Sequence, residues 1–414
     1  MPEQVVIIGS GQAGAQAAVS LREHGFTGSV TLIGDEAGLP YQRPPLSKSY
    51  LTIDSPDSAL ALRAASVYER MGITIDDTDP AIRIDRKAAK VLLRSGRRLD
   101  FTHVVIATGA RVRRLPIEGD DLDGVVQLRT LQDARILREL LRSPRSVVVI
   151  GGGFIGTEVA AAAVKNGHGV TIIESTTRLM SRVVSPDVSN FVTSVHQQRG
   201  TVVRLNASAS AIVGKEGKAI AVKLDNGETI PADVVVSGIG VLPNTELAAD
   251  AGLAVHNGVL VNAHLRTTDP RISAIGDCAA FPCTHASGQI LRLESVQNAV
   301  DQARHVAARI AARDESVYST VPWFWTDQFG MKIQMVGIGA DTDRIIRHGS
   351  IAEDSFSVLR FSGDGQLRCV ESVNRSSDHI SARKLLSRGA YIGEFENYPG
   401  ASLKDLVDRT VVNR

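Results

Sequence analysis

Short, unbroken apolar runs followed by helical segments rich in small residues recur along the first half of the chain. The first such unit has an apolar run at residues 5–8 and a helical segment at residues 15–24. The second has a run at residues 146–150 and a helical segment at residues 157–166. An apolar run without polar alternation is typical of a parallel strand that is buried on both faces. The pattern therefore predicts two α/β units, each built on a parallel sheet.

After Pro322 the chain leaves this α/β pattern. Antiparallel strands are predicted at residues 333–338, 355–361 and 366–373, with a hairpin turn at 362–365 and a helix at 381–387. A small α+β domain is therefore expected in the last ninety or so residues.

A glycine-rich turn follows the first strand of each α/β unit. The glycines are Gly9, Gly11 and Gly14 in the first unit and Gly151, Gly153 and Gly156 in the second. In such a turn the first glycine permits the tight bend, the second lets a pyrophosphate approach the backbone, and the third lets helix and strand pack closely. Each turn is followed by a second strand that ends at an acid, Asp35 or Glu174. Two complete units of this kind predict that the chain binds two dinucleotides.

Glu174 indicates which dinucleotide the second unit prefers. A carboxylate at this strand end can accept hydrogen bonds from both adenosine ribose hydroxyls, whereas a 2′-phosphate there would meet a like charge. The sequence therefore predicts NADH rather than NADPH. Arg178 and Arg182 follow closely and could soften this preference, and the alternative is that Glu174 is an ordinary solvated loop acid.

Composition and charge exclude several other classes of protein. In 414 residues, 46 Lys and Arg side chains nearly cancel 45 Asp and Glu, so no global charge would draw the chain to nucleic acid or to an anionic membrane. No apolar run reaches the roughly 18 residues that would span a bilayer. The first strand has no charged, apolar leader before it, so a cytoplasmic protein is expected. The three cysteines, Cys278, Cys283 and Cys369, fit a reducing compartment and match no metal-ligand spacing.

Three further segments resemble the two-dinucleotide flavoprotein reductases. They are VVIATG at 104–109, the strand that closes the first dinucleotide fold; TDPRISAIGD at 268–277, the second FAD motif; and IGVLPN at 239–244, the strand returning from an inserted NAD domain. The resemblance implies two Rossmann-type domains, for FAD and NAD, with the NAD domain inserted in the FAD domain. It also implies that Asp277 binds the ribityl chain of FAD. The implied boundaries are 1–110 and 242–320 for the FAD domain, 111–241 for the NAD domain and 321–414 for a C-terminal α+β domain.

The chain lacks the redox-active cysteine pair of the disulfide reductases in this superfamily, which would lie near YQRPPLSK at residues 41–48. Electrons on the flavin must then leave for an external acceptor. That segment, with LRTLQDA, LESVQNAVDQAR and PWFWTDQFG, closely resembles the FAD-dependent NADH:ferredoxin reductases of bacterial cytochrome P450 and aromatic-ring dioxygenase systems, the putidaredoxin reductase type. The resemblance implies FAD and NADH as cofactors, a [2Fe-2S] ferredoxin as partner, and a monomer or weak homodimer.

Two residues are predicted to carry the chemistry. Glu158, in the first turn of the second dinucleotide helix, can reach toward the nicotinamide, and Lys48 stands where the family places a lysine that pairs with this acid near flavin N5. The pair would fix the nicotinamide and stabilise the charge of reduced flavin. No general base is required, because hydride passes between stacked rings. The alternatives are an acid that complements the helix dipole and a solvated lysine.

The resemblance assigns four more residues to FAD. Arg43 and Arg129 are expected to neutralise its phosphates. Val296, in the helix that begins near Ser295, is expected to stabilise negative charge on the pyrimidine edge through its backbone N–H. Trp325 is expected in the aromatic wall at the flavin rim. The arginines could instead be surface residues, and the tryptophan part of a core.

Arg304 is identified with the basic residue that the family presents to the acidic surface of ferredoxin. The alternative is an exposed arginine with a nearby acid, Asp301. Two other functions stay open for the whole chain. One is the activity of a rubredoxin or monodehydroascorbate reductase, and the other is a redox-dependent binding module such as apoptosis-inducing factor, whose core the chain also resembles.

Overall fold

The computed structural model describes residues 3–53, 56–396 and 401–412. The chain forms two compact units, each assembled from separate stretches of sequence. Unit 1 comprises residues 1–42, 56–111 and 241–322, and unit 2 comprises residues 43–55, 112–240 and 323–414. Residues 43–55, which include the PPLSK segment, thus group with the second dinucleotide fold rather than the first.

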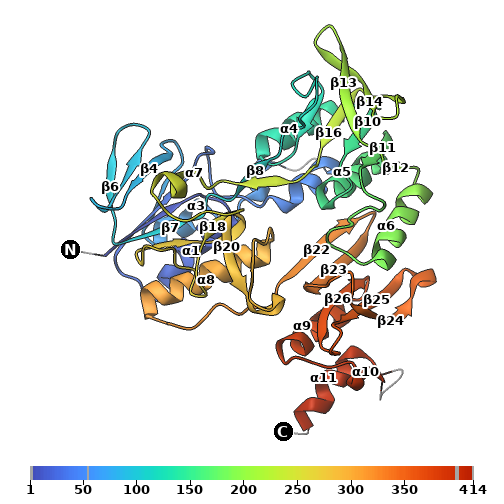
Figure 1. The fold of residues 1–414 in the computed structure, drawn as a ribbon. Coiled ribbons are helices and arrows are strands. Elements are labelled where there is room, and N and C mark those ends of the chain that lie inside the picture. Colours follow the sequence, from blue (N-terminus) through green and yellow to red (C-terminus); the bar gives the residue numbers. More distant parts are fainter. Residues whose placement is uncertain (1–2, 54–55, 397–400, 413–414) are drawn as a thin grey trace. The chain divides into compact units, whose positions relative to one another are not determined.

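Five parallel strands form the central sheet of unit 1, in the order β19-β7-β1-β2-β3. They are β1 (Gln4–Ile8), β2 (Ser29–Ile33), β3 (Ile73–Asp76), β7 (His103–Ile106) and β19 (Ile272–Ala274). Ile7, Leu32 and Val105 are fully buried in this sheet. Helices α1 (Gln12–Glu23) and α8 (Val296–Ala312) pack side by side (Figure 1).

Smaller elements complete unit 1. An antiparallel sheet of β4 (Ala81–Asp85), β5 (Lys90–Leu93) and β6 (Arg98–Asp100) is inserted between β3 and β7. A second small sheet contains β18 (Val259–Leu260), β20 (Ala279–Cys283) and β21 (Gln289–Leu291). The remaining pieces are η2 (Asp57–Leu60), α3 (Ala65–Arg70), β17 (Val241–Pro243), α7 (Glu246–Asp250), η3 (Gly276–Cys278) and η4 (Thr284–Ala286), and β8 (Ala110–Val112) ends where the chain leaves the unit.

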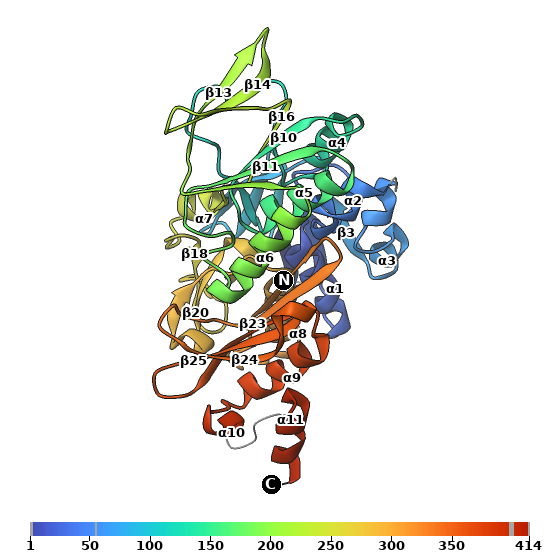
Figure 2. The same cartoon turned by 90° about the vertical axis from the view of Figure 1, so that its right-hand side faces the viewer.

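Unit 2 has a second five-stranded parallel sheet, in the order β12-β11-β10-β16-β9. Its strands are β9 (Val125–Gln127), β10 (Ser146–Ile150), β11 (Gly169–Glu174), β12 (Val202–Leu205) and β16 (Val234–Ser237). Its helices are η1 (Pro44–Ser47), α2 (Ser49–Thr52), α4 (Leu131–Leu140), α5 (Phe154–Lys165) and α6 (Pro186–Gln198). An antiparallel sheet of β13 (Ala209–Lys215), β14 (Lys218–Leu224) and β15 (Thr229–Pro231) is inserted before β16, and its hairpin extends away from the parallel strands (Figure 2).

The two parallel sheets repeat the same plan. In each sheet the strand that leads into the glycine turn, β1 or β10, lies at the centre. A three-stranded antiparallel sheet is inserted in the sequence before β7 in unit 1 and before β16 in unit 2. They differ in the source of one outer strand. In unit 1 this strand is β19, which follows the inserted unit in sequence, whereas in unit 2 it is β9, which precedes β10. The predicted parallel α/β units are therefore present, and the repeat extends to insertions that the sequence pattern does not predict.

The C-terminal part of unit 2 is an antiparallel sheet in the order β22-β23-β26-β25-β24. Its strands are β22 (Trp323–Gln328), β23 (Met331–Gly337), β24 (Arg344–Ser350), β25 (Ser355–Phe361) and β26 (Leu367–Val373). Helix α9 (Ser376–Ser387) packs on β23 and β26, and η5 (Ile351–Glu353), α10 (Gly393–Glu396) and α11 (Leu403–Val412) complete it. The α+β prediction is confirmed, but the sequence analysis misses β22 and β24 and starts α9 five residues too late.

A buried charge cluster ties this sheet to the dinucleotide fold of unit 2. The Glu371 carboxylate on β26 is fully buried and accepts the backbone N–H of Ser185, the N-cap of α6, at 2.9 Å. Arg360 donates to the same carboxylate at 3.0 Å. Burial raises the pKa of Glu371, and the hydrogen bonds from Ser185 and Arg360 oppose that rise. A buried carboxylate without partners would cost several kcal/mol, so these contacts favour keeping the C-terminal sheet on α6.

Residues Ala279–Cys283 form strand β20 although the segment contains Pro282. Strand β18 pairs only with Ala279 and Ala280, so Pro282 lies beyond that ladder and pairs with Ile290 of β21 on one side alone. A proline is tolerated in a strand where one edge has no partner.

Among the described residues, no helix has both the length and the apolar character needed to cross a bilayer.

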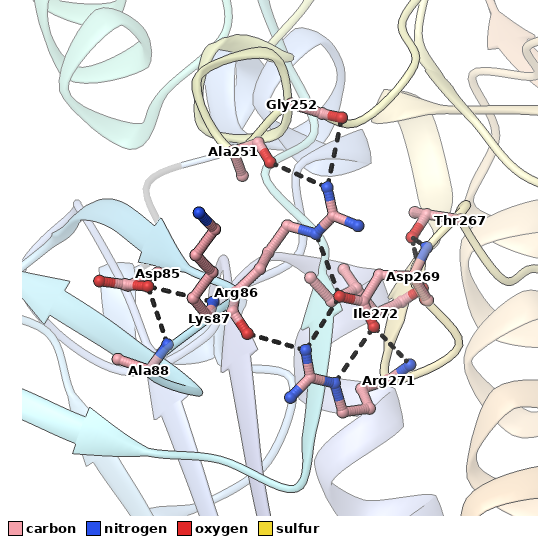
Figure 3. A network of polar contacts seen from close by, with 10 residues as sticks. All are labelled: Asp85, Arg86, Lys87, Ala88, Ala251, Gly252, Thr267, Asp269, Arg271 and Ile272. Atoms are coloured by element: carbon pink, nitrogen blue, oxygen red, sulfur yellow. Dashed lines mark hydrogen bonds and ion pairs between the residues drawn. The ribbon is translucent and has the colours of Figure 1, made fainter.

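In unit 1, a clasp of two arginines and one acid joins the β4–β6 insertion to later parts of the chain (Figure 3). Asp269 is 5% exposed and accepts hydrogen bonds from Arg86 Nε at 3.0 Å and Arg271 Nη2 at 3.1 Å. The Arg86 guanidinium also donates to the carbonyls of Ala251 and Gly252, at 3.3 and 3.4 Å. Burial alone would raise the pKa of Asp269, but the hydrogen bonds from Arg271 and Arg86 hold it at about 2.

We expect Asp269→Asn to lower the free energy of unfolding by about 2 kcal/mol near neutral pH, because two charge-assisted hydrogen bonds lose their charged acceptor. The folded-state pKa of Asp269 lies below its unfolded value of roughly 3.9. Its contribution is therefore present above pH 4 and is lost as the pH falls toward 2. Denaturant unfolding followed by circular dichroism between pH 2 and 7 measures this.

Asp100→Asn is the matched control, because Asp100 pairs with Lys90 on the surface and is 60% exposed. We expect it to change stability by less than about 0.5 kcal/mol. Equal free energies of unfolding for the two variants at pH 7 would contradict a stabilising role for the hydrogen bonds from Arg86 and Arg271 to Asp269.

Candidate active site

The third glycine of each turn is required by packing. A Cβ atom on Gly14 would lie 1.9 Å from the carbonyl oxygen of Gly9, and one on Gly156 would lie 2.0 Å from that of Gly151. These contacts are between the helix and the turn that precedes it. Any side chain at either position would push α1 or α5 away from its strand.

The middle glycine of each turn faces open space. Apart from the adjacent residues in the chain, no heavy atom of the described residues lies within 4 Å of a Cβ atom built on Gly11 or on Gly153. Both residues are helix N-caps with extended backbone, and neither helix has a side-chain cap. The first N–H groups of α1 and α5 are thus left for another acceptor. The residues present fit the pyrophosphate of a dinucleotide in both units.

Glu174 ends strand β11 beside the second turn. Its Oε2 accepts the backbone N–H of Gly152 at 2.7 Å, and its Oε1 accepts the N–H of Thr176 at 2.8 Å. The carboxylate therefore braces the glycine turn itself, a role that the sequence analysis does not foresee. The Arg178 guanidinium donates to the carbonyl of Val184 at 2.7 Å, which turns it to a partner other than Glu174.

We expect Glu174→Gln to raise the ratio of kcat/KM for NADPH to that for NADH about tenfold. The amide keeps one oxygen for Gly152 but removes the charge that would repel a 2′-phosphate. Steady-state kinetics with both nucleotides and ferricyanide measure this ratio. Asp225→Asn, which removes an exposed charge in the β14–β15 turn, should leave it unchanged. A native protein that already prefers NADPH would refute the prediction.

Lys48 and Glu158 form a close ion pair in unit 2. The distance from Lys48 Nζ to Glu158 Oε1 is 2.8 Å, and the side chains are 18% and 2% exposed. Lys48 lies between η1 and α2, with φ −124° and ψ −110°, so it is not the solvated helix residue of the alternative interpretation. Because α5 begins at Phe154, Glu158 lies in its second turn rather than the predicted first turn. The helix dipole is thus a weaker explanation for an acid at this position.

Two hydroxyl groups complete the surroundings of Glu158. Ser47 Oγ donates to Oε2 at 2.5 Å, and Thr326 Oγ1 on β22 donates to Oε1 at 2.6 Å. With Lys48, three donors converge on one buried carboxylate. Neither hydroxyl is among the predicted site residues. Ser47 adjoins Lys48 and could have been found from that position, whereas Thr326 stands in the segment PWFWTDQFG, in which only Trp325 is assigned a role.

The two predicted phosphate-binding arginines lie close together. Arg43 Nη1 donates to the backbone carbonyl of Arg129 at 2.7 Å. Arg129 immediately precedes Thr130, the N-cap of α4, whose capping box with Asp133 fixes this backbone. Their predicted role toward FAD stays a prediction.

The predicted FAD residues of unit 1 occupy the ends of its elements. Asp35 follows β2 and is exposed, and Asp277 is half-buried in η3, where its carbonyl accepts Arg292 Nη1 at 3.1 Å. Val296 is the first residue of α8, close to the expected helix start, and Ser295 is the N-cap, whose hydroxyl accepts the N–H of Asn298 at 3.0 Å. The Val296 N–H lies in the first helical turn, where no intrahelical acceptor exists.

Trp325 is half-buried on β22, in an aromatic group. Its ring centroid lies 5.6 Å from that of Trp323 and 6.1 Å from that of Phe324. Trp323 packs edge-on against His379, and the Arg383 guanidinium stands 5.4 Å from its ring. Trp323 thus packs against α9 within the C-terminal part of unit 2. Trp325 therefore stays the candidate for a flavin contact.

Arg304 is on α8 and is 60% exposed, with its guanidinium 3.8 Å from Asp301. This long contact is weak, because exposed pairs contribute little and Asp301 also accepts a hydrogen bond from Gln297. Arg309, one turn farther along, is 5% exposed, and burial lowers its pKa to about 10. Of these two arginines, Arg304 is the one available to a partner.

The three cysteines have no redox arrangement. Cys278, Cys283 and Cys369 are unpaired and at most 3% exposed, and burial raises the pKa of all three thiols. The described part of the chain also has no group of three or more His, Cys, Asp or Glu placed to hold a metal ion.

We expect a variant with all three cysteines changed to alanine to keep its NADH-driven reduction of ferredoxin within about threefold of the native rate, because buried neutral thiols are poor nucleophiles. Stopped-flow or steady-state assay of the FAD-loaded protein measures this. A loss of more than roughly tenfold with FAD still bound would reveal a thiol role.

Comparison with known proteins extends over nearly the whole chain. Residues 3–303 match the family model described as pyridine nucleotide-disulphide oxidoreductase, and residues 323–407 match the model described as reductase C-terminal. Rhodocoxin reductase of Rhodococcus erythropolis is 49% identical over 383 residues, 92% of this chain and 89% of that protein. Putidaredoxin reductase of Pseudomonas putida is 39% identical over 393 residues, 93% and 92% of the two chains.

A solved structure agrees with these matches. The ferredoxin reductase for the CYP199A2 system from Rhodopseudomonas palustris superposes with a TM-score of 0.94 at 42% identity, over 98% of this chain and 100% of that chain. The family match confirms FAD and a nicotinamide dinucleotide as the cofactors. The choice of NADH, the domain boundaries and the roles of the site residues stay predictions. On sequence and fold together, the chain is an oxidoreductase that belongs to the pyridine nucleotide-disulphide oxidoreductase family.

Proposed function

We propose that the protein is an FAD-dependent NADH:ferredoxin reductase, which passes electrons to a [2Fe-2S] ferredoxin that serves a cytochrome P450 or a ring-hydroxylating dioxygenase. The observation that carries the proposal is the Lys48–Glu158 ion pair, in which the carboxylate is buried. Lys48 lies in the segment where the resemblance places the thiols of a disulfide reductase, and this chain has none there. The similarity to the ferredoxin reductase for the CYP199A2 system supports a ferredoxin as the acceptor. We also propose a cytoplasmic location, which three unpaired cysteines favour.

The chain's own residues contribute binding and charge rather than acid–base chemistry. When bound, FAD would supply an acceptor for the hydride of NADH and a donor of single electrons. Glu158 and Lys48 provide a paired acceptor and donor for the polar groups of the nicotinamide side. Because the Glu158 carboxylate is held by three donors, its orientation is fixed before any ligand arrives. Such preorganisation lowers the cost of aligning two rings for hydride transfer.

The experiment that tests the proposal compares acceptors. Purified protein with about one noncovalent FAD per chain is assayed with NADH against several [2Fe-2S] ferredoxins, rubredoxin and monodehydroascorbate. Highest kcat/KM with a [2Fe-2S] ferredoxin supports the proposal. Preference for rubredoxin or monodehydroascorbate would assign one of the related reductase activities, and reduction without turnover on any acceptor would favour a binding module. Ferricyanide alone does not discriminate, because it accepts electrons from any exposed reduced flavin.

A further inference from the structure

A chain of buried polar side chains leads from helix α6 through strand β22 to Glu158. His196 Nε2 lies 3.0 Å from Gln328 Oε1. Gln328 Nε2 donates to Thr157 Oγ1 at 2.8 Å and to Thr326 Oγ1 at 3.1 Å, and Thr326 Oγ1 donates to Glu158 Oε1 at 2.6 Å. All five side chains belong to residues that are at most 3% exposed, although none but Glu158 is charged.

The hydrogen bonds in this chain have one direction. The Gln328 amide oxygen can only accept, so His196 donates to it through its Nε2–H. Burial lowers the pKa of His196, which favours the neutral ring. The Gln328 amide nitrogen then donates toward Thr326, whose hydroxyl is left with its proton for Glu158. Along the path from His196 through Gln328 and Thr326, each donor thus points toward the Glu158 carboxylate, and aligned hydrogen bonds of this kind strengthen one another in a buried environment. A second branch leads from Gln328 to the Thr157 hydroxyl.

The geometry of β22 explains why the network comes from the C-terminal sheet. Thr326 and Gln328 are two residues apart on one strand, so their side chains project from the same face. Phe324 shares that face, and its ring centroid lies 4.4 Å from that of Phe154 on α5. The apolar contact seats the strand on the helix, and the two polar residues then reach Thr157 and Glu158.

We propose that Thr326 and Gln328 are positioning residues for Glu158: from the C-terminal sheet they hold its carboxylate in the orientation that accepts Lys48. This inference rests on the proposed function, because it assumes that the Lys48–Glu158 pair takes part in NADH oxidation. The C-terminal domain thereby forms part of the nicotinamide-side site. Thr157 links the same network to the glycine turn, because its hydroxyl donates to the Gly153 carbonyl at 2.9 Å.

The test compares Thr326→Val, which keeps the shape but removes the hydroxyl, with Thr326→Ser, which restores it. We expect Thr326→Val to slow flavin reduction by NADH about tenfold in single-turnover absorbance measurements, with little change in the NADH concentration that half-saturates the rate. Gln328→Met should act in the same direction by about threefold, because it removes the donor that orients Thr326. Thr326→Ser should recover most of the native rate.

A second measurement does not depend on turnover. When the Glu158 carboxylate is released, Lys48 loses a partner, so its reaction with an amine-labelling reagent should speed up severalfold in Thr326→Val. Mass spectrometry of the labelled peptide measures this in protein with or without FAD. Thr193→Val is the matched control, because its hydroxyl donates only to the Ser189 carbonyl within α6, and it should change neither readout.

Two results would overturn the inference. One is a folded, FAD-loaded Thr326→Val variant with native flavin reduction and native Lys48 labelling. The other is slower reduction with unchanged Lys48 labelling, since the hydroxyl would then not act through the carboxylate. Failure of the proposed function would give a different result. NADH would then not reduce the native protein, or the native protein would prefer another acceptor. The labelling of Lys48 would still report on the hydrogen-bond network.

Discussion

Arg304→Glu should slow reduction of an acidic [2Fe-2S] ferredoxin by about one to two orders of magnitude at low ionic strength, through slower association. A protein with a formal net charge of +1 must gather basic side chains locally to attract such a partner. Arg304 is 60% exposed and only loosely paired with Asp301, at 3.8 Å. Reversing its charge therefore replaces attraction by repulsion without removing a packed side chain.

Two controls separate docking from flavin chemistry. Transfer from NADH to ferricyanide should stay at the native rate in Arg304→Glu, and added salt should narrow the gap with ferredoxin because it screens the steering field. Arg313→Glu changes the net charge by the same amount on an exposed residue at the C-cap of α8. Equal ferredoxin rates for native protein and Arg304→Glu, or an equal loss in Arg313→Glu, would place the docking surface elsewhere.

Gly153→Ala should raise the KM for NADH ten- to a hundredfold while the protein stays folded and retains FAD. Within the described part of the chain, only the adjacent residues have heavy atoms within 4 Å of the added Cβ, so the fold accepts it. The methyl group would instead occupy the space through which a pyrophosphate reaches the N–H groups at the start of α5, and a lost hydrogen bond to a charged group costs about 1.5–3 kcal/mol. NADH titration of flavin reduction measures the effect.

Substitutions at two other glycines are the controls for Gly153→Ala. Gly169→Ala, at the exposed start of β11, also meets no atom within 4 Å and should keep the native KM. Gly156→Ala should instead lose stability, because its Cβ would meet the Gly151 carbonyl oxygen at 2.0 Å. A native KM in Gly153→Ala would mean that the phosphates bind elsewhere.

Features that depend on residues close together in the sequence can be predicted from it, whereas contacts between distant residues cannot. The turn from β10 into α5 is local, since glycines at fixed spacing after an apolar run leave one favoured backbone path. The β4 strand is also local but is missed, because only Ile84 of its five residues is buried and alternation is faint. The Lys48–Glu158 pair is anticipated from family resemblance alone, since nothing in spacing joins two residues so far apart.

Long-range polar contacts leave no pattern in a single sequence. Thr326 and Glu158 are separated by 168 positions, and nothing in the segment around either residue points to the other. Their partnership arises because β22 packs on α5 through Phe324 and Phe154. The tryptophans draw attention to the segment 322–330, but the hydrogen bonds to Glu158 and Thr157 come from the opposite face of that strand, from Thr326 and Gln328.

The source of the outer strands has a consequence for synthesis on the ribosome. Strand β7 leaves the exit tunnel long before β19. The edge of β7 in the first sheet therefore stays unpaired while residues 112–240 of unit 2 are translated. The second parallel sheet has all five strands once β16 has emerged, because its outer strand β9 is made first. The parallel sheet that begins later can therefore be completed earlier, which reverses the usual order in which N-terminal parts of a chain fold first. Until Ile272–Ala274 appears, the nascent chain carries an unpaired parallel edge of the kind that invites aggregation.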